Sequence, residues 1–154
     1  MDEFEKKALE NIEKYGCHIL TIPEDDLPGF SYSIGIEKNL NKPELIIVGL
    51  KPELSKSIIN KCYFRLKNGE VILPNRFYPD FLEGFEIYTI EVAKKHYREY
   101  FGWGYWLYQN WDFRVLQIIW PSTDDKWPWH EKTEFYEWAQ PVLNESGKLE
   151  IPLR

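Results

Sequence analysis

The stretch GFSYSIGIEKNLNKPELIIVGL, residues 29–50, decides the predicted fold. Within residues 30–36, large apolar side chains alternate with serine and glycine, which is the period of two expected of a β-strand with one small-residue face. Residues 44–50 are a continuous apolar run, typical of a strand that is buried on both faces. The polar residues 37–43 between these strands end in a proline and predict a loop. The chain is therefore expected to contain a sheet.

Helices and further strands are predicted on both sides of this stretch. Residues 3–15 and 52–66 carry apolar side chains at helical spacing, and a glycine follows each segment closely. A short helix is expected to begin near residue 94, although two glycines weaken its continuation, and Thr133 is expected to cap a last helix. The further strands are 17–22, 85–92 and 113–120, and residues 76–84 are expected to form a loop.

The pattern predicts an α+β fold in a single domain over residues 1–154, because the sequence contains no repeat, linker or low-complexity segment. Its sheet is expected to be mainly antiparallel and partly rolled, with the helices 3–15 and 52–66 flanking it.

The composition excludes several classes of protein. A formal net charge of −6 argues against a nucleic-acid binder, because such binding depends on neutralising phosphates with Lys and Arg. No apolar segment approaches the ~20 residues of a membrane-spanning helix, so no membrane partner is expected. Cys17 and Cys62 have no metal-ligand spacing and make no disulfide framework, which favours a reducing cytoplasm and leaves no predicted metal site. The acidic charge suits a basic protein partner, although solubility alone also explains it.

Aromatic side chains are concentrated in the C-terminal part of the chain. They make up 17% of all residues, and the seven tryptophans fall between residues 103 and 138. The densest run is REYFGWGYWLYQNWDF, residues 98–113. Because Tyr and Trp each carry a polar atom that needs a partner when buried, they suit interfaces as well as cores. We expect most of these rings in the core and a minority at a contact surface. The predicted ligand- or partner-binding residues are Tyr32, Phe101, Trp103, Trp127, Trp129 and His130.

No catalytic residue and no cofactor are predicted. The histidines and cysteines form no metal-ligand spacing, and adjacent strand residues such as Cys17 and His18 point to opposite faces. The sequence has no glycine-rich phosphate loop, which disfavours a Rossmann or P-loop nucleotide site. The small-residue face of residues 30–36 leaves room for a flat ligand or, more simply, for a packed helix.

Several motifs together resemble a known family. In order along the chain, they are YGCHIL, GFSYSIGI, KPELIIVGL, EYFGW, VLQIIWP and WPW. The pattern resembles a bacterial family known as domain of unknown function 4262, over residues 11–130. Where related sequences often read His-Pro-Glu-Leu, this chain has Lys42 in place of the histidine, so no histidine role is carried over. The family implies no established catalytic residue and leaves the activity open.

The order of hairpin, small-residue strand, apolar strand and helix is also similar to the opening of split-barrel flavin-binding proteins. In those proteins, side chains of strands and loops hold the flavin phosphate. The resemblance implies Ser31, Ser33 and Lys51 as an alternative phosphate-binding set, with flavin as the alternative cofactor. Fold analogy does not establish function, and no basic cluster accompanies the two serines.

The expected function is that of a cytoplasmic, non-catalytic binding domain. It would bind a basic protein partner through an aromatic-rich acidic surface, as an immunity protein binds a toxin. The alternative is a flavin- or nucleotide-binding split-barrel enzyme or carrier. The sequence predicts no oligomeric state.

Overall fold

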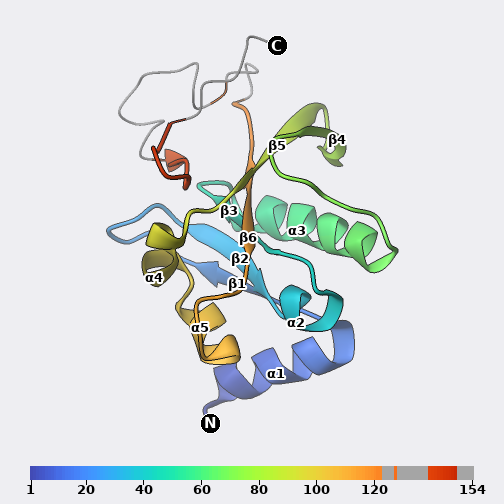
Figure 1. The fold of residues 1–154 in the computed structure, drawn as a ribbon, viewed down its shortest axis with the longest axis vertical. Coiled ribbons are helices and arrows are strands. Elements are labelled where there is room, and N and C mark those ends of the chain that lie inside the picture. The colour runs from blue at the N-terminus through green and yellow to red at the C-terminus, as the bar shows by residue number, and fades with distance from the viewer. Residues whose placement is uncertain (123–126, 128–138, 149–154) are drawn as a thin grey trace.

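The computed structural model describes residues 1–122, 127 and 139–148, and these form one six-stranded sheet with helices packed against both of its faces (Figure 1). The strands are β1 (His18–Ile22), β2 (Phe30–Ile34), β3 (Glu44–Val48), β4 (Phe77–Leu82), β5 (Phe85–Glu91) and β6 (Val115–Ile119). Their order is β1-β2-β3-β6-β5-β4, and β3 with β6 is the single parallel pair among these strands. The sheet is open and partly curled, which confirms the predicted α+β fold class.

The helices begin and end where local signals place them. They are α1 (Glu3–Tyr15), α2 (Ile36–Leu40), α3 (Pro52–Lys67), α4 (Tyr97–Tyr100) and α5 (Gly102–Tyr108), and the 3-10 turn Lys94–His96 precedes α4. The side chain of Asp2 accepts from the Glu5 amide while that of Glu5 accepts from the Asp2 amide, so a capping box starts α1. Pro52 occupies the first turn of α3, where its missing N–H costs nothing.

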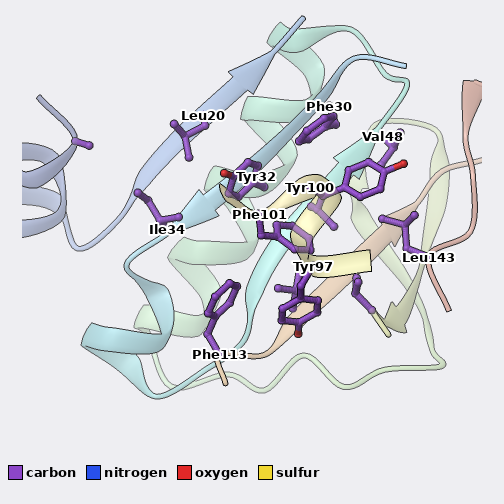
Figure 2. Packing of buried hydrophobic residues seen from close by; sticks show 14 of the residues in the cluster. Leu20, Phe30, Tyr32, Ile34, Val48, Tyr97, Tyr100, Phe101, Phe113 and Leu143 are labelled. Atoms are coloured by element: carbon purple, nitrogen blue, oxygen red, sulfur yellow. The ribbon is translucent and has the colours of Figure 1, made fainter. Parts of the chain in front are cut away.

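Two hydrophobic clusters cover opposite faces of the sheet. On one face, α1 and the segment of α4 and α5 pack on β2 and β3, and Figure 2 shows Tyr32, Tyr97, Phe101 and Phe113 gathered there. The Phe101 ring centroid lies 5.2 Å from that of Tyr32 and 5.2 Å from that of Tyr97, both edge to face. On the other face, α3 packs through a stripe of buried residues. These are Ser55, Ile58, Ile59, Cys62 and Leu66.

Three local predictions were wrong. Residues 30–36 are not one strand, because Gly35 has φ of 109°, a left-handed conformation that turns the chain from β2 into α2. The predicted loop 76–84 instead contains β4, which pairs with β5, and Pro79 is tolerated because β4 is an edge strand. The predicted loop 37–43 instead contains most of α2. The helix expected from residue 94 does not run on without a break, because α4 ends at Tyr100 and Phe101 has φ of −114° and ψ of 41° before α5 begins. The last helix predicted from Thr133 lies outside the described residues.

Candidate functional site

Helix α5 and the turn that follows it carry four aromatic side chains at the surface. We call Trp103, Tyr105, Trp106 and Trp111 the α5 aromatic patch. Tyr105 is 41% exposed, and the three tryptophans are half-buried. The rings form two pairs, with 5.2 Å between the centroids of Trp103 and Trp106 and 4.8 Å between those of Tyr105 and Trp111. The patch is therefore an ordered set of rings.

Close packing of α5 on the core sets the direction of this patch. Gly104 is buried against Phe113, and a Cβ at this position would lie 2.6 Å from Phe113 Cζ. The helix approaches the core this closely because residue 104 has no side chain. The Lys94 ammonium group donates to the carbonyl oxygens of Trp111 and Phe113, both at 2.7 Å, and thus holds the turn after α5. The guanidinium of Arg98 lies 5.3 Å from the Trp111 ring centroid, a cation–π contact.

The polar atoms of the α5 aromatic patch are not hydrogen-bonded to other described residues. Within the described part of the chain, no hydrogen bond joins its three indole N–H groups or the Tyr105 hydroxyl to another residue. The described residues also contain no buried side-chain nitrogen or oxygen without a partner, so the three indole N–H groups are open to solvent, and Tyr105 is itself exposed. Trp120 shows the contrast, since its indole N–H donates to the Val48 carbonyl at 2.9 Å.

A buried carboxylate fixes the C-terminal end of α5. Glu44, the first residue of β3, is 1% exposed. Its Oε1 accepts hydrogen bonds from the Ser33 hydroxyl at 2.9 Å and the Ile36 amide at 3.1 Å. Its Oε2 accepts from the Gly35 amide at 2.9 Å, from the Glu37 amide at 3.3 Å and from the Tyr108 hydroxyl. Five donors therefore converge on one side chain.

These donors come together because α2 begins just after the end of β2, and the end of β2 lies beside the start of β3 in the antiparallel pair. The first amides of a helix have no partner within the helix, and the carboxylate of Glu44 accepts from three amides of this segment. The Tyr108 hydroxyl adds a second link, because it also accepts from the amides of Gly35 at 3.3 Å and Lys38 at 3.2 Å. Tyr108 is the last residue of α5, so this network ties α5 to β2, α2 and β3.

Burial changes the acidity of both side chains. It raises the pKa of Glu44 to about 7, while the hydrogen bonds from Tyr108 and Ser33 act in the opposite direction. Burial, followed by the charge of Glu44, raises the pKa of Tyr108, so the phenol keeps its proton and remains a donor. The carboxylate accepts from the protein's own groups, and we assign the network a positioning role for α5.

The structure brings three of the six predicted site residues together. Tyr32 and Phe101 are 1% and 0% exposed, so their rings belong to the core beneath α5. The Tyr32 hydroxyl accepts from the Trp103 amide at 3.0 Å. Trp127 lies apart from them in a third cluster, where its ring centroid is 5.4 Å from that of Phe77. Trp129 and His130 lie outside the described residues.

The two serines of the alternative phosphate-binding set have other partners. The Ser33 hydroxyl donates to Glu44 and accepts from the Leu45 amide at 3.0 Å. The Ser31 hydroxyl lies 3.4 Å from that of Thr21, and both serines are buried. Lys51 is exposed, immediately before α3.

Five residues of this site were not predicted from the sequence. The quoted run 98–113 contains Tyr105, Trp106, Tyr108 and Trp111, but a helical exposure pattern was needed to separate them from the core rings. Glu44 carries a weaker signal, as the charged residue that opens an otherwise apolar strand.

The described residues contain no group of three or more His, Cys, Asp or Glu placed to hold a metal ion. None of the helices described has both the length and the apolar character needed to cross a membrane.

The family model named Domain of unknown function (DUF4262) matches residues 11–134. The chain belongs to the DUF4262 family. The DUF4262 match includes Glu44, Tyr108 and the whole α5 aromatic patch, and it confirms the resemblance seen in the motifs. Comparisons with curated proteins and with solved structures found no match.

Proposed function

We propose that this DUF4262 chain is a non-catalytic binding domain that contacts a protein partner through the α5 aromatic patch. The observation that carries the proposal is the set of four aromatic polar groups on α5 and the following turn that form no hydrogen bond with any described residue. Tyr and Trp at such positions present a large apolar area together with a hydrogen-bond donor, which is the combination found at interface anchors.

The support beneath the rings favours binding. Gly104 and the Lys94 contacts hold α5 and the following turn, and the Glu44–Tyr108 network holds the end of the helix. Rings that are already ordered lose little conformational entropy when a partner binds, so more of the contact energy appears as affinity.

We further propose that the partner is a basic protein met in the cytoplasm. A net charge of −6 favours encounter with a positively charged partner, because the summed field attracts it before contact. Cys17 and Cys62 are free and buried, and burial raises the pKa of each thiol to about 12. Buried thiols of this kind behave as small apolar side chains, as expected in a reducing compartment.

The test uses the purified chain as bait, followed by a measured dissociation constant for each captured protein. Tyr105→Ala should weaken binding by about tenfold or more, since interface anchors contribute on the order of 2 kcal/mol. The matched control is Phe64→Ala, which removes an aromatic ring that is 64% exposed on α3. Equal binding by wild type, Tyr105→Ala and Trp106→Ala would contradict the proposal. A rise in melting temperature with flavin mononucleotide would instead support the flavin alternative.

A further inference from the structure

The two edges of the sheet differ in how they are protected. Edge strands need protection because their outward N–H and C=O groups invite another strand. On β4, Pro79 lacks an N–H, Asp80 has φ of 75°, and the register with β5 shifts between Tyr78 and Leu82. The other edge strand, β1, reads HILTI, which contains no proline and no acidic or lysine side chain. Its register with β2 is continuous over all five residues.

The outer side of β1 is open in the described part of the chain. A strand in an antiparallel pair directs alternate N–H and C=O groups away from its neighbour. No backbone hydrogen bond from a described residue outside β2 reaches residues 18–22. Thr21 is exposed, and Ile19 and Ile22 are half-buried. The strand thus offers main-chain groups and apolar side chains together.

Opposite charges flank the two ends of this strand. At the first end, the Asn11 amide nitrogen lies 2.9 Å from His18 Nδ1, and Lys7 precedes Asn11 by one turn on the same face of α1. Burial and then the charges of Lys56 and Lys7 lower the pKa of His18. At the other end, the turn after Ile22 carries Glu24, Asp25 and Asp26, all exposed. None of these lysines and carboxylates forms a salt bridge with a described residue.

We propose that β1 pairs antiparallel with β1 of a second copy of this chain, about a two-fold axis near Leu20. Such pairing places His18 of one copy beside Ile22 of the other. The acidic turn of each copy then lies next to Lys7 and Lys56 of its partner, and this contact occurs twice. A two-fold interface must be self-complementary in this way. The two open sheets become one continuous sheet, and the unprotected edges disappear from the surface.

The dimer uses the edge of β1, whereas the α5 aromatic patch belongs to α5 and the turn after it. The test is sedimentation equilibrium of the full chain over about 1–100 µM, a range that covers ordinary dimer affinities. Wild type is expected to dimerise, and added salt should weaken the dimer because its flanking charges are exposed. Thr21→Lys places a charge on the strand edge and should give a monomer, whereas Thr21→Val should remain dimeric.

Charge reversals test the register without altering the strand. Asp25→Lys and Lys56→Glu should each raise the dimer dissociation constant by about tenfold or more, and combining them should restore much of the affinity. Glu83→Lys is the matched control, since it makes the same change of charge in an exposed turn at the opposite edge. Circular dichroism checks that each variant folds.

The proposal is overturned if the wild type is monomeric throughout this range, or if Asp25→Lys and Glu83→Lys weaken the dimer equally. It is also overturned if Thr21→Lys folds and still dimerises. If Thr21→Lys does not fold, the charge reversals decide. Tyr105→Ala should leave the dimer intact, so failure here and failure of the proposed partner binding are distinguishable.

Discussion

Replacement of Glu44 by glutamine should remove a pH dependence of stability between pH 4.5 and about 7. Burial raises the pKa of Glu44 from its ordinary value of 4.5 to about 7, so the folded protein keeps a proton that the unfolded chain releases in this range. The free energy of unfolding therefore falls as the pH rises. Since one pKa unit corresponds to ~1.4 kcal/mol, the contribution of Glu44 is roughly 3 kcal/mol, present below pH 4.5 and lost above pH 7.

His18 contributes to the same pH range with the opposite sign. Burial and the two nearby lysines lower its pKa below 6.5, so the unfolded chain binds this proton more readily than the folded protein. Stability from His18 is therefore present above pH 6.5 and is lost as the pH falls through its folded pKa. Because Glu44→Gln leaves His18 unchanged, subtracting the curve of the variant from that of the wild type isolates Glu44.

The glutamine also has a cost that does not depend on pH. If its amide nitrogen replaces Oε2, it faces the amide donors of Gly35 and Glu37. If the amide nitrogen replaces Oε1, the Ile36 amide is the one donor left facing it, because the Ser33 hydroxyl can rotate and accept from the nitrogen. The second orientation leaves one buried donor unpaired, which costs ~1–3 kcal/mol.

Urea denaturation followed by far-UV circular dichroism at several pH values from 4 to 8 measures both contributions. The stability advantage of wild type over Glu44→Gln should be greatest near pH 4.5 and should shrink by roughly 3 kcal/mol by pH 7.5. An advantage that stays constant with pH would refute the reasoning. An advantage that grows with pH would show that the five donors outweigh burial and keep the carboxylate ionised.

Two further predictions concern α5. Tyr108→Phe removes one donor from the Glu44 carboxylate and should lower the free energy of unfolding by ~1.5–3 kcal/mol in urea titrations, so a loss below ~0.5 kcal/mol would contradict the assigned network. Gly104→Ala should destabilise by thermal melting, because overpacking against Phe113 costs ~1–3 kcal/mol and the gain in helix propensity is at most ~1 kcal/mol. Its control is Gly102→Ala, where an added Cβ meets nothing within 4 Å, and equal effects of the two changes would count against close packing at Gly104.

Features with local causes were predictable from the sequence. The helix predicted at 3–15 is α1, and that predicted at 52–66 is α3, because a cap, a glycine or a proline marks each end. The alternation of residues 30–34 and the apolar run 44–48 likewise identified β2 and β3. Helical spacing was less informative about exposure. Phe4 and Ala8 are both apolar residues at helical spacing within 3–15, but Ala8 is buried and Phe4 is 78% exposed.

Features that depend on distant contacts were not predictable. Nothing near Glu44 in the sequence indicates that Tyr108 donates to it, because 64 residues separate the two. Residues 76–84 were predicted as a loop for the same reason. Pro79 argues against a strand unless that strand is known to lie at the edge of the sheet, as β4 does. The aromatic run 98–113 predicted a mixture of core and surface rings, but the packing of Gly104 on Phe113 decides which rings belong to the surface.

The position of β6 between β3 and β5 constrains the order of folding during synthesis. Residues up to 48 can form β1, β2 and β3 as neighbouring hairpins, and β4 with β5 forms another hairpin, but in the described sheet these two units are joined through β6. Until Val115 to Ile119 leave the ribosome, the buried strands β3 and β5 each keep an open edge. Pairing across so long a stretch of chain is slow, and open apolar edges are prone to aggregate. The native sheet can therefore be completed only after β6 has been synthesised, and we expect a chain interrupted before β6 to depend on chaperones.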